Sequence, residues 1–154
     1  MAIRQVDLAY VAGFFDGEGS IMMSMPKGKH VRVEVAVSQN TRTVLDLHVK
    51  LFGGHVYGYA PKKRPRAIMY QWKVYGQDAY EFLIKIEPYL HVKKVEAHEG
   101  MEIWLLRKNM QVVERILKSR AERKKTRWEW LNSSEVETPS TELPGLSVEK
   151  LSAS

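Results

Sequence analysis

Hydrophobic residues recur along the first 131 positions with two different spacings. In five segments they return every three or four residues, which predicts helices over residues 7–16, 41–52, 77–86, 93–106 and 111–131. In four shorter segments they alternate with polar residues, which predicts strands over residues 20–25, 31–38, 55–59 and 68–75. Asp7 is the expected N-cap of the first helix, and Asn40 or Thr41 that of the second.

The order of these segments indicates the fold class. A helix, a hairpin, a second helix, a second hairpin and two final helices predict an α+β domain with four antiparallel strands and helices on one face. Val31, Val33, Val35 and Val37 form one strand face that must lie in the core. We expect this domain to cover residues 1–131, and the remaining residues, rich in Ser, Thr, Glu and Pro, to form a flexible acidic tail.

Composition narrows the possible chemistry. With 44% hydrophobic residues among 154, the chain can build a core, and without cysteine it has no disulfide, thiol nucleophile or cysteine-ligated zinc. No segment reaches the roughly 18 apolar residues of a membrane span, so we expect no membrane partner. No targeting segment is expected either, which fits the cytoplasm of a bacterium or archaeon and an organelle-encoded protein equally well.

Positive charge is concentrated in the predicted domain. The net charge of the chain is +6, whereas the last 23 residues contain four glutamates and one lysine, so residues 1–131 have a net charge of +9. Such a basic domain favours a polyanionic partner. Charge alone does not distinguish a nucleic acid from an anionic surface.

The first predicted helix has a face of small residues. Ala9, Ala12, Gly13 and Asp16 are three or four positions apart and therefore share one side of the helix. Two interpretations are open: this side packs on the chain's own sheet, or on the same helix of a second copy. In the second case Asp16 and Glu18 of both copies converge, and carboxylates that close need a bridging cation. Mg²⁺ prefers oxygen ligands and suits the hydrolysis of phosphodiesters.

The sequence VAGFFDGEG, at residues 11–19, resembles the motif of the LAGLIDADG homing endonucleases. The single motif, the length and the order of helices and hairpins resemble the homodimeric branch of that family. The resemblance covers residues 7–107. It implies a saddle-shaped sheet, double-stranded DNA as substrate and a divalent cation, Mg²⁺ or Mn²⁺, as cofactor. It also places the small-residue face of the first helix at the dimer interface.

The resemblance assigns roles to individual positions. Glu18, with the backbone carbonyl of Gly17, matches the family's metal ligands, and Asp16 matches an earlier acid with a structural place. Gln39 matches a polar residue that holds a water molecule, and Lys93 matches a lysine that reaches the scissile phosphate. From the residues alone, Asp16 and Gln39 are as typical of helix caps, and Lys93 of a solvated first turn.

Two positions vary from the family's usual pattern. Relatives near this branch have a pocket arginine where this chain has Thr43, and the neighbouring Arg42 is the candidate substitute. Glu18 replaces the more usual aspartate. The pattern allows this exchange, but the longer side chain changes the expected spacing to the metal.

The polar faces of both predicted hairpins are candidate DNA-reading surfaces, because a two-stranded ribbon fits the major groove of B-DNA. In the first hairpin this face comprises Ser20, Met22, Ser24, His30, Arg32, Glu34, Ala36 and Ser38. In the second it comprises Tyr57, Tyr59, Met69, Gln71 and Lys73. The two hairpin loops add cations for phosphate contacts, namely Lys27, Lys29, Lys62, Lys63, Arg64 and Arg66.

The last predicted helix contains a second group of cations, namely Arg115, Lys118, Arg120, Arg123, Lys124, Lys125 and Arg127. Glutamates lie between them, so the group is equally typical of a phosphate-binding face and of an ordinary solvated face. The histidines have no metal-ligand spacing. We expect the four tryptophans to be core or packing residues rather than platforms on which bases stack.

These features predict a homodimeric, Mg²⁺-dependent endonuclease that cuts double-stranded DNA at a long pseudo-palindromic site and, by resemblance, leaves short 3′ overhangs. Two alternatives retain the fold. One is a maturase that binds intron RNA and does not need Glu18, and the other is a DNA-binding regulator without catalysis.

Overall fold

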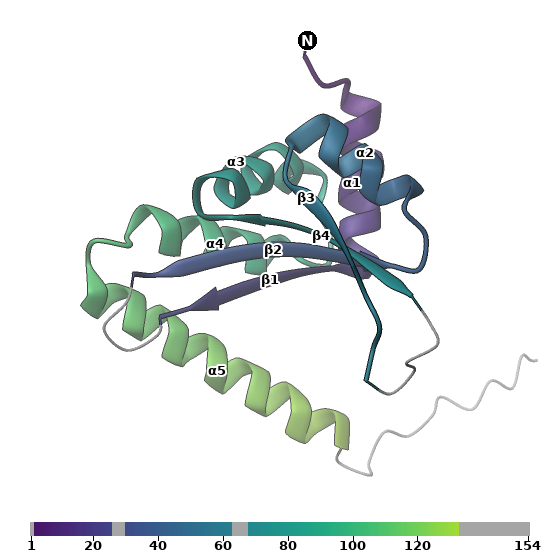
Figure 1. Cartoon of the computed structure of the whole chain (residues 1–154). Helices are drawn as coiled ribbons and strands as arrows, with labels where there is room; N and C mark the ends of the chain where they lie inside the picture. Colours follow the sequence, from purple (N-terminus) through teal and green to yellow (C-terminus); the bar gives the residue numbers. More distant parts are fainter. Residues whose placement is uncertain (1, 26–29, 63–67, 133–154) are drawn as a thin grey trace, which may run out of the picture. The chain divides into compact units, whose positions relative to one another are not determined.

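The computed structural model describes residues 2–25, 30–62 and 68–132, in which helices and hairpins alternate as predicted (Figure 1). In chain order the elements are α1 (Gln5–Glu18), β1 (Gly19–Ser24), β2 (Arg32–Gln39), α2 (Thr43–Phe52), β3 (His55–Tyr59), β4 (Met69–Tyr75), α3 (Gly76–Ile86), the 3₁₀ helix η1 (Glu87–Tyr89), α4 (Lys94–Leu105) and α5 (Met110–Asn132). The predicted α+β class and the order of elements are confirmed.

The predicted N-caps of the first two helices are wrong. Asp7 lies inside the first turn of α1, where its carboxylate accepts two hydrogen bonds of 2.8 Å from the Arg4 guanidinium. This charged partner engages the side chain that would otherwise cap the helix. At α2 the N-cap position is Arg42, without a capping side chain, so neither Asn40 nor Thr41 has that role.

The four strands form one antiparallel sheet in the order β1-β2-β4-β3. β2 and β4 pair in the centre and join the two hairpins. Figure 1 shows α1 to α4 on one side of this sheet. Val33, Val35 and Val37 of β2 are fully buried, as their alternation predicts.

An aromatic cluster fills the space between the sheet and the helices. The ring of Phe82 in α3 lies 5.0 Å from that of Trp72 and 5.3 Å from that of Phe15, measured between centroids. The indole N–H of Trp72 donates a 2.8 Å hydrogen bond to the carbonyl oxygen of Gly53. Gly54 has a φ of +81°, and a Cβ there would lie 2.7 Å from Val74, so only glycine fits this link between α2 and β3.

The chain divides into two compact units, residues 1–119 and residues 120–154, and helix α5 has residues in both. In the second unit Trp128 and Trp130 are exposed, so these two are not core residues. Residues 133–154, most of the predicted tail, lie outside the described residues. In the described part of the chain, no helix is long and apolar enough to cross a membrane.

Candidate active site and nucleic-acid interface

At the C-terminal end of α1 the carboxylate of Glu18 lies next to the backbone of Gly17, which has no side chain to cover it. Glu18 is the last helical residue and is exposed, and Gly19 leads directly into β1. A Cβ at Gly19 would lie 2.2 Å from the ring of Phe15, so this position requires glycine. At Gly17 a Cβ would meet nothing within 4 Å, and its carbonyl, in the last turn, has no helical partner.

Asp16 is bound within its own chain. Its Oδ2 accepts hydrogen bonds from the backbone N–H groups of His91 (2.8 Å) and Val92 (3.2 Å), and its Oδ1 accepts one from that of Lys93 (2.9 Å). Burial raises the pKa of this carboxyl, but the three N–H groups and the Lys93 charge outweigh it, so the pKa is lowered. The carboxylate predicted for the dimer interface therefore attaches the segment before α4 to α1.

Lys93 is attached to the same end of α1 by its side chain. Its ammonium donates a hydrogen bond to the backbone carbonyl oxygen of Asp16. Carbonyls in the last turn of a helix form the negative end of its dipole and attract cations. Lys93 is half-buried there, rather than an unattached residue of the first turn of α4.

Gln39 lies at the same end of the sheet. Gly19 pairs with Val37, so the antiparallel continuation of β2 from Val37 to Gln39 runs beside the exit of α1. The side-chain oxygen of Gln39 accepts a 2.8 Å hydrogen bond from the N–H of Asn40, and Gln39 does not cap α2. The structure thus places Glu18, Gln39 and Lys93 around the C-terminal end of α1.

The oxygens at this site fit a hard cation. Because Asp16 is engaged with residues 91–93, the available donors are the Glu18 carboxylate and the Gly17 carbonyl, both of the kind that Mg²⁺ prefers. Among the described residues, no group of three or more His, Asp or Glu side chains could hold a metal ion. Glu18 and Gly17 alone would leave most positions of an octahedral ion open.

Register places the predicted DNA-reading residues of both hairpins on one face of the sheet. Ser20, Ala36, Lys73 and His55 are successive Cα partners across the four strands. A second row joins Ser38, Gln71 and Tyr57, and the Gln71 amide donates a 2.8 Å hydrogen bond to the Ser38 hydroxyl. The other members of this face are Met22, Ser24, Arg32, Glu34, Tyr59 and Met69.

Two residues of this face were missed by the sequence analysis. His55 pairs with Lys73, and Tyr75 pairs with Glu34. Each is two positions from a residue that was predicted, so extending the alternation by one step at each end finds both. The guanidinium of Arg32 lies 4.8 Å from the centroid of the Tyr75 ring.

Two members of this face are not exposed, contrary to the alternation. Glu34 is 7% exposed and Ala36 is 1% exposed. The Glu34 carboxylate lies 3.0 Å from the Lys73 ammonium and 3.2 Å from the Arg32 guanidinium. Glu34 is therefore engaged with its neighbours and is not an open contact for a base.

Arg42 is held beside the end of β2. Its guanidinium forms a 3.1 Å ion pair with Asp46 and lies 5.8 Å from the ring centroid of Tyr70, the Cα partner of Gln39. It is half-exposed and directed along α2. Its contact with DNA stays a prediction.

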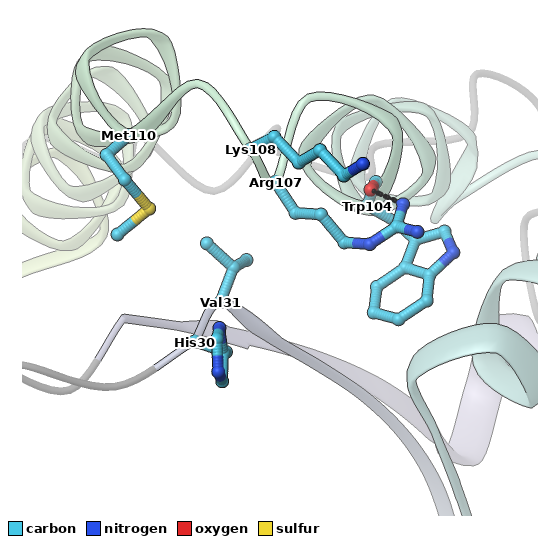
Figure 2. A pocket seen from close by; sticks show the side chains of 6 residues that line it. All are labelled: His30, Val31, Trp104, Arg107, Lys108 and Met110. Carbon is cyan, nitrogen blue, oxygen red and sulfur yellow. Dashed lines mark hydrogen bonds between the residues drawn. The ribbon is translucent and has the colours of Figure 1, made fainter.

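Only one of the predicted loop cations is described. Lys62 is exposed, whereas Lys27, Lys29, Lys63, Arg64 and Arg66 lie outside the described residues. His30, two residues before β2, lines a cavity of about 590 Å³ together with Val31, Trp104, Arg107, Lys108 and Met110 (Figure 2). Arg107 lies over the Trp104 ring at 4.1 Å and donates a 2.6 Å hydrogen bond to the Trp104 carbonyl oxygen.

The exposed face of α1 differs from the predicted small-residue face at one residue, Ala12. Ala9 and Gly13 are exposed, but Ala12 is fully buried and packs in the core with its neighbour Val11. Val6 and Tyr10 are 64% and 52% exposed and complete the outer face with Ala9, Gly13 and Gly17. Ala12 is thus excluded from this surface.

The model of the LAGLIDADG endonuclease family matches residues 11–97. The chain belongs to the LAGLIDADG endonuclease family. The matched residues of this LAGLIDADG chain include Gly17, Glu18, Gln39 and Lys93, and they end before α5.

Solved structures of similar fold agree with this membership. The homing endonuclease I-CvuI in complex with the I-CreI target is 29% identical, with a TM-score of 0.55, over 68% of this chain and 69% of that chain. I-CvuI in complex with its own target is 25% identical, with a TM-score of 0.55, over 73% and 80%. The archaeal intron-encoded homing endonuclease I-Vdi141I, complexed with DNA, is 20% identical with a TM-score of 0.58, over 78% and 83%, and shows the fold alone. The comparison with curated proteins finds no match.

Proposed function

We propose that this LAGLIDADG chain is a homodimeric, site-specific endonuclease of double-stranded DNA that requires a divalent cation. The observation that supports it most is the convergence of Glu18, Gln39 and Lys93 at the end of α1, next to the polar face of the sheet. We assign this function to residues 1–131, with residues 132–154 as a tail.

Two copies would complete the site. The exposed face of α1 has glycine at positions 13 and 17, so a second helix can approach closely. Such packing about a two-fold axis brings one Glu18 from each chain to the centre. The dimer then offers two carboxylates and two Gly17 carbonyls, and phosphate oxygens of the DNA are further ligands.

Each residue of the site has a separate task in phosphodiester hydrolysis. Mg²⁺ held by Glu18 and Gly17 supplies charge that stabilises the attacked phosphate and lowers the pKa of water. The Gln39 amide orients the attacking water by hydrogen bonding. The Lys93 ammonium, held at the end of α1, stabilises the negative charge that develops on the phosphate oxygens.

The sheet face would read one half-site per chain. Its mixture of Arg, Lys, Gln, Ser, Tyr and Met offers hydrogen bonds to base edges and apolar contacts to thymine methyl groups. Because the two chains are related by a two-fold axis and each reads one half-site, the target is long and pseudo-palindromic. Few contacts reach the base pairs at the centre, so their deformability contributes to selection. By likeness to the family, cleavage crosses the minor groove and leaves short 3′ overhangs.

A plasmid library of random inserts tests this proposal. Wild-type protein with Mg²⁺ should cut at one pseudo-palindromic sequence, and Glu18→Gln should bind that sequence without cutting it. Glu81→Gln, which makes the same charge change on an exposed position of α3, is the matched control and should cut normally. Cutting by Glu18→Gln at the wild-type rate would disprove the assigned role.

A further inference from the structure

An acidic residue lies within the proposed DNA-reading face. Across the four described strands Glu34 is the only acidic residue. It is buried between its Cα partners Met22 and Tyr75 on the neighbouring strands. A carboxylate at this position repels phosphates, so its benefit must come from the groups that it holds.

Glu34 forms an ion pair with two cations, one at each oxygen, and the contact at Oε1 lacks hydrogen-bond geometry. Oε1 lies 3.0 Å from the Lys73 ammonium, and Oε2 lies 3.2 Å from the Arg32 guanidinium. The Arg32 guanidinium also stacks at 4.8 Å on the ring of Tyr75. The Lys73 side chain is only 24% exposed, so burial restricts its position on the sheet. The Arg32 side chain is 57% exposed and is positioned by its contacts with Glu34 and Tyr75.

The register explains how Lys73 reaches Glu34. The direct Cα partner of Lys73 on β2 is Ala36, whose methyl group leaves space above the strand. Glu34 is two positions along β2 on the same face, within reach of a long side chain on the diagonal. Ala36 is 1% exposed, as expected for a small residue under a lysine stem.

We propose that Glu34 is a specificity-positioning residue that holds Lys73 and Arg32 over base edges and away from phosphates. This inference rests on the proposed function and adds a preference for particular bases in the DNA target. Lysine and arginine donate to the O6 and N7 atoms of guanine, so the positions opposite these two side chains in each half-site are guanines. Without Glu34 both cations turn to phosphates, which are the same at every sequence.

Loss of the Glu34 charge therefore strengthens non-specific binding and weakens discrimination. In Glu34→Gln the shape is retained, while Lys73 and Arg32 are released. Each released cation that contacts a phosphate raises non-specific affinity about fivefold near physiological salt and steepens the salt dependence by about one unit. A residue that itself contacted DNA would show the opposite change in affinity.

The test compares four proteins on a random 30-base-pair duplex library without Mg²⁺. They are wild type, Glu34→Gln, the double variant Glu34→Gln/Lys73→Met, and Glu81→Gln as a charge-matched control on α3. Sequencing of the bound fraction gives base preference, and a scrambled duplex gives non-specific affinity and its salt slope. Thermal unfolding of each protein checks the fold.

The expected result has three parts. A Glu34→Gln dimer releases four cations, and with two to four of them on phosphates it binds the scrambled duplex about 25- to 600-fold more tightly. It also loses guanine preference at one symmetric set of positions. In the double variant Arg32 stays released, so this variant returns about half of the gain in affinity, on a logarithmic scale, without regaining the preference. Glu81→Gln resembles wild type in all readouts.

Two results would overturn the role of Glu34. Weaker binding with a lost preference for cytosine would show that Glu34 accepts a hydrogen bond from a base itself. An equal loss of affinity on every duplex, with a lower melting temperature and no change in the double variant, would show a purely structural role. Failure of the wild type to bind any duplex would instead overturn the proposed function.

Discussion

Asp16 joins two segments of the chain that are 75 residues apart. Its carboxylate binds the backbone N–H groups just before α4, and its own carbonyl receives the Lys93 ammonium. The folded pKa of Asp16 is lowered. Its charge therefore stabilises the fold above the unfolded value of about 4, and this contribution is lost as the pH falls through the folded pKa.

Asp16→Asn should lower both stability and cleavage. The amide loses one acceptor oxygen and places an NH₂ against backbone donors, which should cost roughly 2 kcal/mol in the free energy of unfolding. Because Lys93 then loses its fixed position, kcat should fall while DNA binding is retained. Urea unfolding and single-turnover cleavage measure the two effects. Asp7→Asn is the control, since Asp7 forms its ion pair with the exposed Arg4, and equal losses in both variants would contradict this role.

His48 is a buried titratable group outside the site. Its Nδ1 lies 2.8 Å from the Val44 carbonyl oxygen, and among the described residues no hydrogen-bond partner of its Nε2 is found. Its ring lies 4.9 Å from that of Trp72. Desolvation lowers its pKa, and the hydrogen bond to Val44 offsets this only in part.

His48 should make the fold less stable in weak acid. Because its folded pKa lies below the unfolded value of about 6.5, the unfolded chain binds more protons, and stability decreases as the pH falls below 6.5. His48→Leu should flatten the dependence of the melting temperature on pH in this range. The exposed His98→Gln, which retains His48, is the control. An unchanged slope in His48→Leu would show that another group causes the effect.

Single residues differ in how far sequence predicts them. Glu18, Gln39 and Lys93 were nominated by motif and element order, and the structure places all three at one end of α1. The burial of Glu34 could not be predicted, because it depends on the lysine that the neighbouring strand β4 places beside it. Its ion pair with Lys73 requires the β2–β4 register, which alternation within one hairpin does not contain.

At the scale of elements, α1 packs on the core with one face and exposes the other. The predicted small-residue face included Ala12, which the structure buries, because helical spacing alone does not show which side faces the sheet. The exposed side contains Val6, Tyr10 and Gly13. This is the surface on which dimerisation is proposed.

Gly13→Leu should separate folding from dimerisation. A Cβ at position 13 would meet nothing within 4 Å in its own chain. Glycine in a helix interior is about 0.5–1 kcal/mol less favourable than other residues, so the monomer should become slightly more stable. The added bulk should prevent close helix approach and raise the dimer dissociation constant at least tenfold. Sedimentation velocity measures this, and Gly13→Ala should give a smaller effect. A Gly13→Leu dimer as tight as wild type would place the interface elsewhere.

Strands and helices were predicted well because both depend on local spacing. Strand bounds agree within one residue and the pairing of each hairpin is as expected. Helix starts were less accurate. Arg4 competes for Asp7, and the end of β2 reaches Gln39, which leaves Asn40 and Thr41 outside a capping position.

At the scale of the whole molecule, phosphate contacts and base contacts should be separable by salt. Lys27 and Lys29 are proposed phosphate ligands in the first hairpin loop, which lies outside the described residues. Changing both to Gln should weaken binding to every duplex and reduce the salt slope by about four in a dimer. Gln71→Ala should instead relax preference at one symmetric pair of positions. A sequence-dependent loss in the lysine variant would contradict this division.

The central claim is that two chains form one catalytic unit to which each contributes Glu18. The most direct measurement mixes wild-type and Glu18→Gln chains during refolding, at constant total protein, and follows double-strand cleavage of the selected site. If only wild-type dimers cut, cleavage falls with the square of the wild-type fraction, to about one quarter at equal mixing. A linear fall, to about one half, would mean that each chain cuts alone and would contradict the dimeric mechanism.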